Sequence, residues 1–192
     1  MAVRSVPTSV GRRVRTVVRL RSAGVLAALL LASVACGGGR PEAVSSPPPP
    51  VVELPAGLDT TVERVVDGDT IVVAGGHHIR LIGIDTPETK DPRRPVQCFG
   101  QEASSFVTDL LPDGTGVRLI GDVEASDFYD RTLAYVYRLP DGLFVNAELI
   151  RQGYARPLTI PPNVAHTDEF LVLAEQAREA GRGLWTACGP AP

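Results

Sequence analysis

The sequence predicts an α+β fold, a five-stranded β-barrel of the OB type that carries three helices. Short runs rich in β-branched residues, separated by glycine and proline turns, dominate the half of the domain that begins near residue 58. A segment with helical spacing separates the third run from the fourth, and two more helical segments follow the fifth. With 192 residues and 44% hydrophobic composition, the chain has room for one such domain and appended segments.

Three strands are expected to open the domain as a meander. Residues 60–66 and 70–74 are rich in valine and threonine and flank an Asp-Gly-Asp tripeptide, which predicts two strands or one sharply bent strand. A Gly-Gly turn leads into a third strand over residues 78–84. Because side chains alternate along a strand, Arg80, Ile82 and Ile84 are expected on one face and Ile79, Leu81 and Gly83 on the other.

A loop, a helix and two strands are expected next. Residues 89–96 combine two prolines with alternating charge, which predicts a loop close to the acidic residues before it. Apolar residues at helical spacing predict a helix over residues 101–111, stopped by Pro-Asp-Gly. Strands follow at residues 117–120 and 133–139.

Two further helices are expected to close the domain. Asn146 is predicted to cap the first, which ends at Gln152 before a glycine. Thr167 or Asp168 is predicted to cap the second, whose apolar stripe continues to Ala180.

Residues 1–36 are expected to be a signal peptide. Their apolar stretch of 13 residues is too short to cross a bilayer, which needs about 20. The end of the leader, Ser-Val-Ala-Cys before three glycines, resembles a bacterial lipoprotein signal in which Cys36 carries the lipid. Cleavage after Ala35 by an ordinary signal peptidase stays open, because Ser33 stands where leucine is usual. In both cases we expect export, either to the outer face of the cytoplasmic membrane through a lipid anchor or into the medium.

The domain is expected to follow a tether. Residues 37–57 are rich in proline, glycine and serine, which predicts an extended spacer of roughly 3 Å per residue. Residues 58–188 then form the domain, and residues 189–192 a short tail.

The charge of the chain without its leader limits how it can bind an anionic partner. The leader holds six of the 19 basic residues and none of the 22 acidic ones, so the rest carries 13 basic against 22 acidic side chains, a formal net charge of −9. A strongly basic stripe for sliding along nucleic acid is therefore excluded. An anionic substrate must be held by a few arginines or by a metal ion.

Three carboxylates lie close to two of the predicted strands. The tripeptide at residues 67–69 would on its own be most simply a tight turn. Asp85 and Glu88, however, follow an apolar strand at the rim of the predicted barrel. Asp69 and Asp85, from adjacent strands, together with a main-chain carbonyl, make an oxygen site that suits Ca²⁺ or Mg²⁺ and not zinc.

The remaining charged residues predict chemistry on a phosphodiester. Glu88 is the candidate base that takes a proton from an attacking water. Planar, permanently charged arginines stabilise the charge on phosphate oxygens, and Arg80 and Arg131 are the candidates.

Six runs mark a resemblance to a known family: VVDGDT, IRLIGIDTPET, FGQEAS, DFYDRTLAYVY, VNAELIRQGYA and GLW. In their order and spacing, residues 58–185 resemble the staphylococcal nuclease (thermonuclease) family. The resemblance implies an OB-type fold and calcium-dependent hydrolysis of single- and double-stranded DNA and of RNA that leaves 3′-phosphates. We expect a monomer.

The resemblance also implies a role for each residue that matches the family's motifs. By this resemblance, Asp69, Asp85 and the carbonyl of Thr86 would bind calcium, and Asp67 would support that metal site. Glu88 would be the general base. Arg80 and Arg131 would bind the phosphate, and Tyr129 would contact a terminal phosphate.

Departures from the family pattern affect the expected substrate contacts. Residues 157–162 (PLTIPP) stand where the family carries aromatic residues that stack on a base, and such stacking is worth about 1–3 kcal/mol per base. Arg93 and Arg94 stand in place of lysines. Asp130 and Thr132 flank the second arginine where glycines are usual, which leaves the geometry of that loop open.

The cysteines and adjacent histidines are expected to be structural. Cys98 and Cys188 remain once Cys36 is set aside, and in an exported protein two such cysteines predict a disulfide. A thiol nucleophile is disfavoured, because neither cysteine has a histidine nearby in sequence. His77 and His78 point to opposite faces of a strand, so together they cannot chelate a metal and are expected at the surface.

Two functions other than a nuclease stay open. The first is a non-catalytic OB module that binds nucleic acid or a protein partner at the cell surface. The second is a calcium-stabilised surface protein without turnover. The joint presence of the candidate metal ligands, base and arginines favours the enzyme, because a binding module has no need of the full set.

Overall fold

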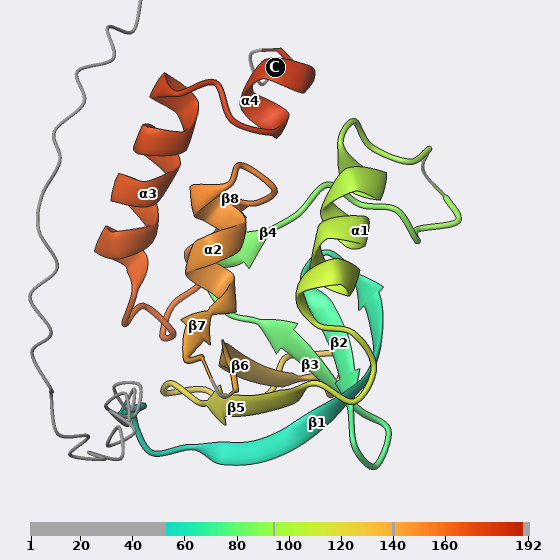
Figure 1. Cartoon of the computed structure of the whole chain (residues 1–192), viewed down its shortest axis with the longest axis vertical. Helices are drawn as coiled ribbons and strands as arrows, with labels where there is room; N and C mark the ends of the chain where they lie inside the picture. Colours follow the sequence, from blue (N-terminus) through green and yellow to red (C-terminus); the bar gives the residue numbers. More distant parts are fainter. Residues whose placement is uncertain (1–52, 94, 140, 190–192) are drawn as a thin grey trace, which may run out of the picture. The chain divides into compact units, whose positions relative to one another are not determined.

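The computed structural model of the protein describes residues 53–93, 95–139 and 141–189, whose elements are labelled in Figure 1. The predicted leader, Cys36 and most of the predicted tether lie outside the described residues. Their assignments therefore stay predictions.

The structure contains eight strands among the described residues. They are β1 (Leu58–Asp67), β2 (Thr70–Val73), β3 (His77–Leu81), β4 (Ile84–Asp85), β5 (Gly116–Ile120), β6 (Thr132–Arg138), β7 (Leu143–Phe144) and β8 (Arg156–Pro157). Strands β3, β2, β1, β5 and β6 pair in that order, and a parallel pairing of β3 with β6 closes the ring. The predicted five-stranded barrel is confirmed.

Strand β1 contributes to both halves of the barrel. Its first residues, Leu58 to Thr61, pair with β5, and the residues from Val62 onward pair with β2. The pairing with β2 shifts register twice, before Arg64 and before Asp67. Such bulges bend a strand and increase its twist, so β1 curves around the barrel and ends at the turn that carries the first candidate carboxylates.

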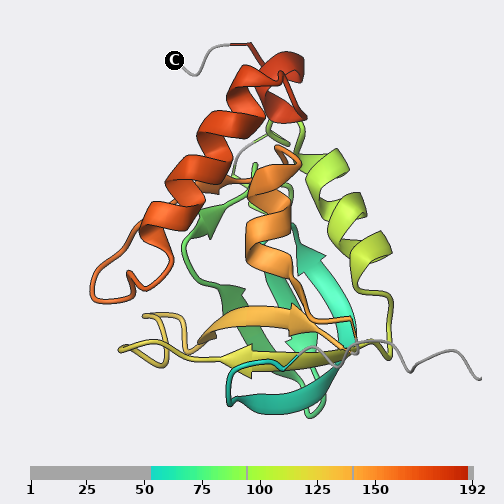
Figure 2. The ribbon, with the colours of Figure 1, turned by 60° about the vertical axis from the view of Figure 1, so that its left-hand side comes forward.

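Helices cover the barrel on one side. They are α1 (Gly100–Leu110), α2 (Val145–Arg151), α3 (Thr167–Glu179) and the short α4 (Leu184–Ala187). Figure 2 shows α1, α2 and α3 next to one another above the strands. Each buries one apolar face, through residues such as Val107 of α1, Leu149 of α2 and Phe170 of α3. The three predicted helices are confirmed, and α4 is an addition to them.

The expectation of an unbroken third strand over residues 78–84 is wrong. Strand β3 ends at Leu81, and Gly83 bends the chain with a φ of 78° before β4 begins. A Cβ at Gly83 would lie 2.5 Å from Cε2 of Phe170, so helix α3 packs directly against this backbone. Because the bend interrupts the alternation, Ile84 is fully buried, while Arg80 turns its guanidinium towards the bend.

The predicted helix caps are also wrong. Asn146 lies inside α2, fully buried, where its Oδ1 accepts the N–H of Val136 and its Nδ2 donates to the carbonyl of Ile82, each at 2.9 Å. The amide therefore links β6 to the segment after β3 and is not a cap. Helix α3 follows His166 without a side-chain cap, and Thr167 and Asp168 lie in its first turn.

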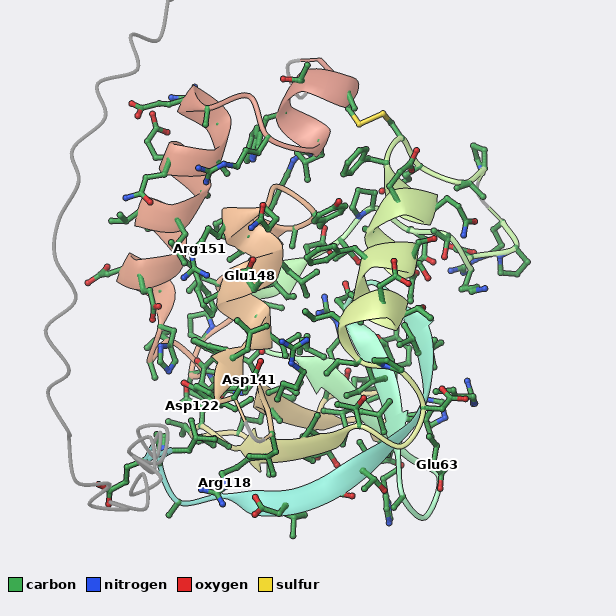
Figure 3. The ribbon with its side chains drawn as sticks, viewed as in Figure 1. Glu63, Arg118, Asp122, Asp141, Glu148 and Arg151 are labelled. Carbon is green, nitrogen blue, oxygen red and sulfur yellow. A yellow bond between two sulfur atoms is a disulfide. The ribbon has the colours of Figure 1, made fainter. Side chains whose placement is uncertain are left out.

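Cys98 and Cys188 form the predicted disulfide, which joins the segment before α1 to the end of α4 (Figure 3). The bridge closes a sequence separation of 90 residues. Next to it, Phe99 and Phe106 stack on Tyr154, with ring centroids 5.3 and 4.0 Å apart. The start of α1 is thus held to the second half of the domain by a covalent bond and by aromatic packing.

Two further findings concern the surface and the membrane. His77 and His78 are exposed in the hairpin between β2 and β3, as predicted. Across the three described ranges, no helix has both the length and the apolar character needed to cross a bilayer.

Candidate active site

Strand register brings the predicted site residues together at one side of the barrel. In β3, Arg80 lies opposite Thr70 of β2 and Leu133 of β6. The turn before β2 carries Asp69, and the loop before β6 carries Arg131. These two segments therefore flank Arg80, one from each neighbouring strand.

Arg80 is held at the bend between β3 and β4. Its Nη1 donates to the carbonyl oxygens of Leu81 and Ile84, both at 2.9 Å. Its Nη2 lies 3.2 Å from Asp69 Oδ2 and 3.6 Å from Asp85 Oδ1. With only 14% of its side chain exposed, the guanidinium has a fixed position and faces two carboxylates.

Asp69 and Asp85 form a carboxylate pair around that guanidinium. Asp69 Oδ2 accepts the main-chain N–H of Thr86 at 3.2 Å, which ties the two turns together. Loss of surrounding water raises the pKa of Asp85, and the Asp69 carboxylate raises it further, against the opposing effect of Arg80 and Arg156. The side chain of Asp85 is still 60% exposed, so a ligand can reach it.

The donors at this position fit a hard cation. Asp69, Asp85 and the carbonyl of Thr86 offer only oxygen, and the mutual repulsion of the two carboxylates would be relieved by a divalent ion. Within the described ranges, no three His, Cys, Asp or Glu side chains converge as a metal cluster. Two carboxylates and a carbonyl would therefore need water to complete a coordination shell of six to eight oxygens.

Glu88 is held by the start of the following loop. Its Oε1 accepts the main-chain N–H groups of Lys90 and Asp91, at 2.5 and 3.1 Å. The bond from Lys90 is the largest of the effects that lower the pKa of Glu88, so the side chain is ionised at neutral pH. Its backbone is bound at both ends by Gln97, whose Oε1 accepts the N–H of Glu88 at 3.1 Å and whose N–H donates to its carbonyl at 2.9 Å.

Asp67 connects the first turn to the loop after Glu88. Its carboxylate accepts the N–H of Gly68 at 2.9 Å, the hydroxyl of Thr89 at 2.8 Å and the N–H of Thr89 at 3.3 Å. Burial raises the pKa of Asp67, and a hydrogen bond with the neighbouring Glu88 raises it too, while Gly68 and Thr89 lower it. Asp67 therefore supports the geometry of the turn and lies beside the candidate base.

Arg131 enters the site from the loop before β6. Asp127 Oδ2 accepts from its Nε at 2.7 Å and lies 2.6 Å from its Nη2. Its Nη1 is 3.5 Å from the hydroxyl of Thr70 on β2. Asp130 adopts a φ of 58°, the left-handed region that favours glycine, so the loop keeps its turn although a side chain is present.

Tyr129 lies on the outer side of the same loop. Its side chain is 76% exposed, and its ring centroid lies 5.5 Å from the guanidinium carbon of Arg131. The geometry leaves the hydroxyl accessible to a ligand bound at Arg131.

A polar cavity of about 290 Å³ unites these residues. Its walls contain seven of the eight predicted catalytic, metal and support residues, all except Tyr129, together with Asp91 and Gln97: Asp67, Asp69, Arg80, Asp85, Thr86, Glu88, Asp91, Gln97 and Arg131. The carboxylates and arginines predicted from separate motifs therefore share one solvent-filled site.

Asp91, which lines the polar cavity, and three residues that hold other site residues in place were missed by the sequence reasoning. Asp127 holds Arg131, Gln97 holds the backbone of Glu88, and Arg156 pairs with Asp85 in the β4–β8 ladder. The signal for Asp127 was its position four residues before Arg131 in an acidic loop. Gln97 lies nine residues after Glu88, on the far side of a loop, and Arg156 is distant from Asp85 in sequence, so only the fold brings each pair together.

The family model described as staphylococcal nuclease homologue matches residues 78–187. This match spans more than half of the chain and contains Arg80, Asp85, Glu88 and Arg131. The chain belongs to the staphylococcal nuclease family. Asp67 and Asp69, in the turn after β1, precede the matched residues.

Named relatives agree with this family membership. The chain is 46% identical over 121 residues to a protein named thermonuclease from Staphylococcus intermedius, covering 62% of this chain and 68% of that protein. It is 40% identical over 128 residues to the thermonuclease of Staphylococcus hyicus, covering 65% and 74%. It is 34% identical over 136 residues to the endonuclease YncB of Bacillus subtilis (strain 168), covering 69% and 64%.

A second pocket of about 300 Å³ adjoins the polar cavity in this staphylococcal nuclease homologue. Arg80 and Arg131 line both spaces. The walls of the second pocket are mainly apolar and include Leu158 and Ile160, from the segment that lacks the aromatic residues expected of the family. The two pockets thus meet at the arginines.

Proposed function

We propose that the protein is a calcium-dependent nuclease that hydrolyses phosphodiester bonds of DNA and RNA and leaves 3′-phosphate ends. Relatives named thermonuclease and endonuclease support the class of reaction. The observation that carries the proposal is the polar cavity itself, in which an ionised Glu88 and two arginines lie with a pair of aspartates.

The residues divide the work of hydrolysis among them. A water oxygen bonds to phosphorus while the bond from phosphorus to O5′ breaks, and Glu88 accepts the proton of that water. The released O5′ takes a proton from solvent, which gives a 5′-hydroxyl and a 3′-phosphate. Arg80 and Arg131 stabilise the charge that develops on the phosphate oxygens.

Asp69, Asp85 and the carbonyl of Thr86 are the residues that would hold Ca²⁺. When bound, the ion would neutralise negative charge on the phosphate and polarise its phosphorus–oxygen bonds. Arg80 Nη2 lies between the same carboxylates, so it contributes positive charge at the position where the phosphate must approach.

The lowered pKa of Glu88 means that its carboxylate is ionised at neutral pH and free to accept a proton, and it also makes Glu88 a weaker base than a carboxylate of ordinary pKa. The N–H of Lys90 and the other donors keep the carboxylate ionised well below neutral pH. Asp67 and Asp85, whose pKa values are raised, are less suited to this role, since each is engaged in holding a turn or a cation.

The test is cleavage of single-stranded DNA by the purified protein with Ca²⁺ and with a chelator in excess. We expect cleavage with Ca²⁺, none after chelation, and recovery when Ca²⁺ is returned. The product ends should be ligated only after the 3′-phosphate is removed and the 5′-hydroxyl is phosphorylated. Binding of the oligonucleotide without cleavage at any Ca²⁺ concentration would instead support a non-catalytic binding module.

We also propose that the protein is exported as a monomer and is anchored through lipid on Cys36. Export and the lipid anchor are inferred from the leader sequence. Mass spectrometry of the mature N-terminus checks it: a diacylglycerol mass on Cys36 supports the anchor, and an unmodified N-terminus at Cys36 contradicts it.

A further inference from the structure

The apolar pocket beside the polar cavity has the location expected for the nucleoside next to the reacting phosphate. A phosphate held between Arg80 and Arg131 lies at the boundary of the two spaces, because both arginines line both. The rest of that nucleotide must then extend away from the carboxylates. The adjoining pocket, about 300 Å³ and mainly apolar, suits the flat face of a base.

One wall of this pocket is an aromatic side chain that otherwise has no structural role. Phe128 lines the pocket and is 97% exposed. Its ring meets the ring of Tyr129 edge-on, with centroids 5.6 Å apart. Hydrogen bonds from the N–H groups of Tyr129 and Arg131 to Asp127 fix the backbone of the loop from which the exposed ring projects.

The part of the wall that comes from residues 157–162 lacks aromatic residues. Leu158 and Ile160 line the pocket there, with 37% and 61% of their surfaces exposed. Aliphatic side chains give apolar contact but no stacking surface. Among the described residues that line the pocket, Phe128 is the one aromatic.

We propose that Phe128 is the residue on which this nuclease stacks the base of its substrate. The inference rests on the proposed function and assigns the base contact to the loop before β6, not to residues 157–162. The base would lie between Phe128 on one side and Leu158 with Ile160 on the other. Because the ring of Phe128 is exposed, a base can cover it without breaking other contacts, and such stacking is worth about 1–3 kcal/mol per base.

The polar atoms of the pocket argue for weak discrimination among bases. Asn163 is 5% exposed, and its Oδ1 and Nδ2 are bonded to the N–H and carbonyl of Glu124, at 2.8 and 3.0 Å. Asp127 is bound to Arg131. These two groups are already paired, and the other polar side chains of the pocket are Glu124, Arg80 and Arg131. Every base has a face on which to stack, so stacking on Phe128 does not depend on which base is present.

The test compares binding of two labelled oligonucleotides of equal length, one of thymidylates and one abasic, to the Glu88→Gln full chain with Ca²⁺. Glu88 does not line the apolar pocket, so the variant keeps that pocket while cleavage is slowed. In this background, Phe128→Ala should raise the Kd for the thymidylate about 5- to 150-fold and leave the Kd for the abasic strand unchanged. Phe128→Trp should preserve the preference for the base-bearing strand.

Val123→Ala is the matched control, since Val123 is 74% exposed a few residues away and does not line the pocket. It should change neither Kd. The assignment is overturned if Phe128→Ala weakens both strands equally, which would indicate a disturbed loop, or leaves the preference for the base intact. Cleavage by the wild-type protein is measured separately: its failure would reject the nuclease, whereas a base preference lost in Phe128→Ala would still support the stacking contact.

Discussion

At the scale of single residues, the site separates its carboxylates by environment. Glu88 receives main-chain N–H bonds that lower its pKa, while Asp85 loses water and faces another carboxylate, both of which raise its pKa. Acidic residues in one cavity thereby acquire different tasks. A low proton affinity keeps Glu88 ionised, and close negative charge makes the Asp69–Asp85 pair attractive to a cation.

Gln97 should act as a positioning residue for Glu88. Gln97→Ala removes the acceptor for the Glu88 N–H but keeps the main-chain bond in the other direction. Losing one such bond, worth on the order of 1 kcal/mol, should lower kcat about fivefold with little change in KM or Tm. Steady-state kinetics check this prediction.

Two variants complete that experiment. Gln97→Glu keeps an acceptor oxygen and should restore most of kcat. Gln101→Ala, at an exposed position in the first turn of α1, should behave as wild type. An equal loss of kcat in Gln101→Ala, or full activity in Gln97→Ala, would contradict the assigned role.

Sequence alone predicted most of the residues in the polar cavity and missed the residues that hold them. Arg80, Asp85 and Glu88 lie within nine positions, so their closeness in sequence and their charge chemistry are enough to group them. Asp127 was missed because its partner is chosen by loop conformation, and Gln97 because its bond partner lies across a loop. Such pairings depend on how the loops fold in three dimensions, which local sequence patterns do not predict.

At the scale of elements, the barrel and the helices are joined by few but specific connections. Asp122, between β5 and β6, accepts from the Tyr135 hydroxyl of β6 at 2.9 Å and from the N–H of Ala165, before α3, at 3.1 Å. Figure 3 labels Asp122 near the lower end of the helical layer. The carboxylate thus links the barrel to the segment that leads into α3.

This connection predicts a pH-dependent contribution to stability. Partial burial raises the pKa of Asp122, but the bonds from Ala165, Tyr135 and Val123 outweigh it and hold the pKa below its ordinary value. Because the pKa of Asp122 is lower in the folded than in the unfolded state, its ionised carboxylate stabilises the fold at pH values above its unfolded pKa of about 4. This stabilisation is lost as the pH falls through the pKa of the folded state. Asp122→Asn should therefore lower the free energy of unfolding by on the order of 1–2 kcal/mol at pH 7.

Denaturant titrations at pH 7, 5 and 3 measure this contribution. The difference between wild type and Asp122→Asn should be constant from pH 7 to 5 and shrink at pH 3. Asp113→Asn, at an exposed turn after α1, is the control and should show no such difference. A difference that grows on acidification would contradict the argument.

The disulfide should stabilise the fold and the loop that carries Glu88. Cys98 follows Gln97 directly and is bonded to Cys188 across 90 residues of sequence. In the chain-entropy model, a closed loop of that size is worth about 4–5 kcal/mol. The Cys98→Ser/Cys188→Ser double variant should unfold at lower denaturant, and a reductant should destabilise the wild type but not the variant. Equal midpoints for the two proteins would contradict the prediction.

The sequence patterns predicted the ends of strands and helices less well than the elements themselves. The apolar residues predicted an unbroken strand over residues 78–84, yet the chain bends at Gly83, where Phe170 of α3 occupies the space of a side chain. Asparagine is a common helix cap, yet the side-chain amide of Asn146 is buried and forms hydrogen bonds with Val136 and Ile82 instead. In each case a tertiary contact outweighed a local propensity.

At the scale of the whole molecule, the closed barrel makes the candidate site possible. The parallel contact of β3 with β6 places Arg80 between the turn that carries Asp69 and the loop that carries Arg131. An open sheet would leave those segments apart. Since the chain without its predicted leader is acidic overall, these arginines and a cation supply the local positive charge for a polyanionic substrate.

The central claim is that Glu88 in this cavity activates water for phosphodiester cleavage. The most direct measurement is kcat on single-stranded DNA with Ca²⁺ for Glu88→Gln, beside Glu63→Gln as a control whose amide can still accept the Gly75 N–H. We expect kcat of Glu88→Gln to fall by about 10²- to 10⁴-fold with DNA binding and folding retained, and that of Glu63→Gln to stay at the wild-type level. A Glu88→Gln protein that turns over at the wild-type rate would contradict the account.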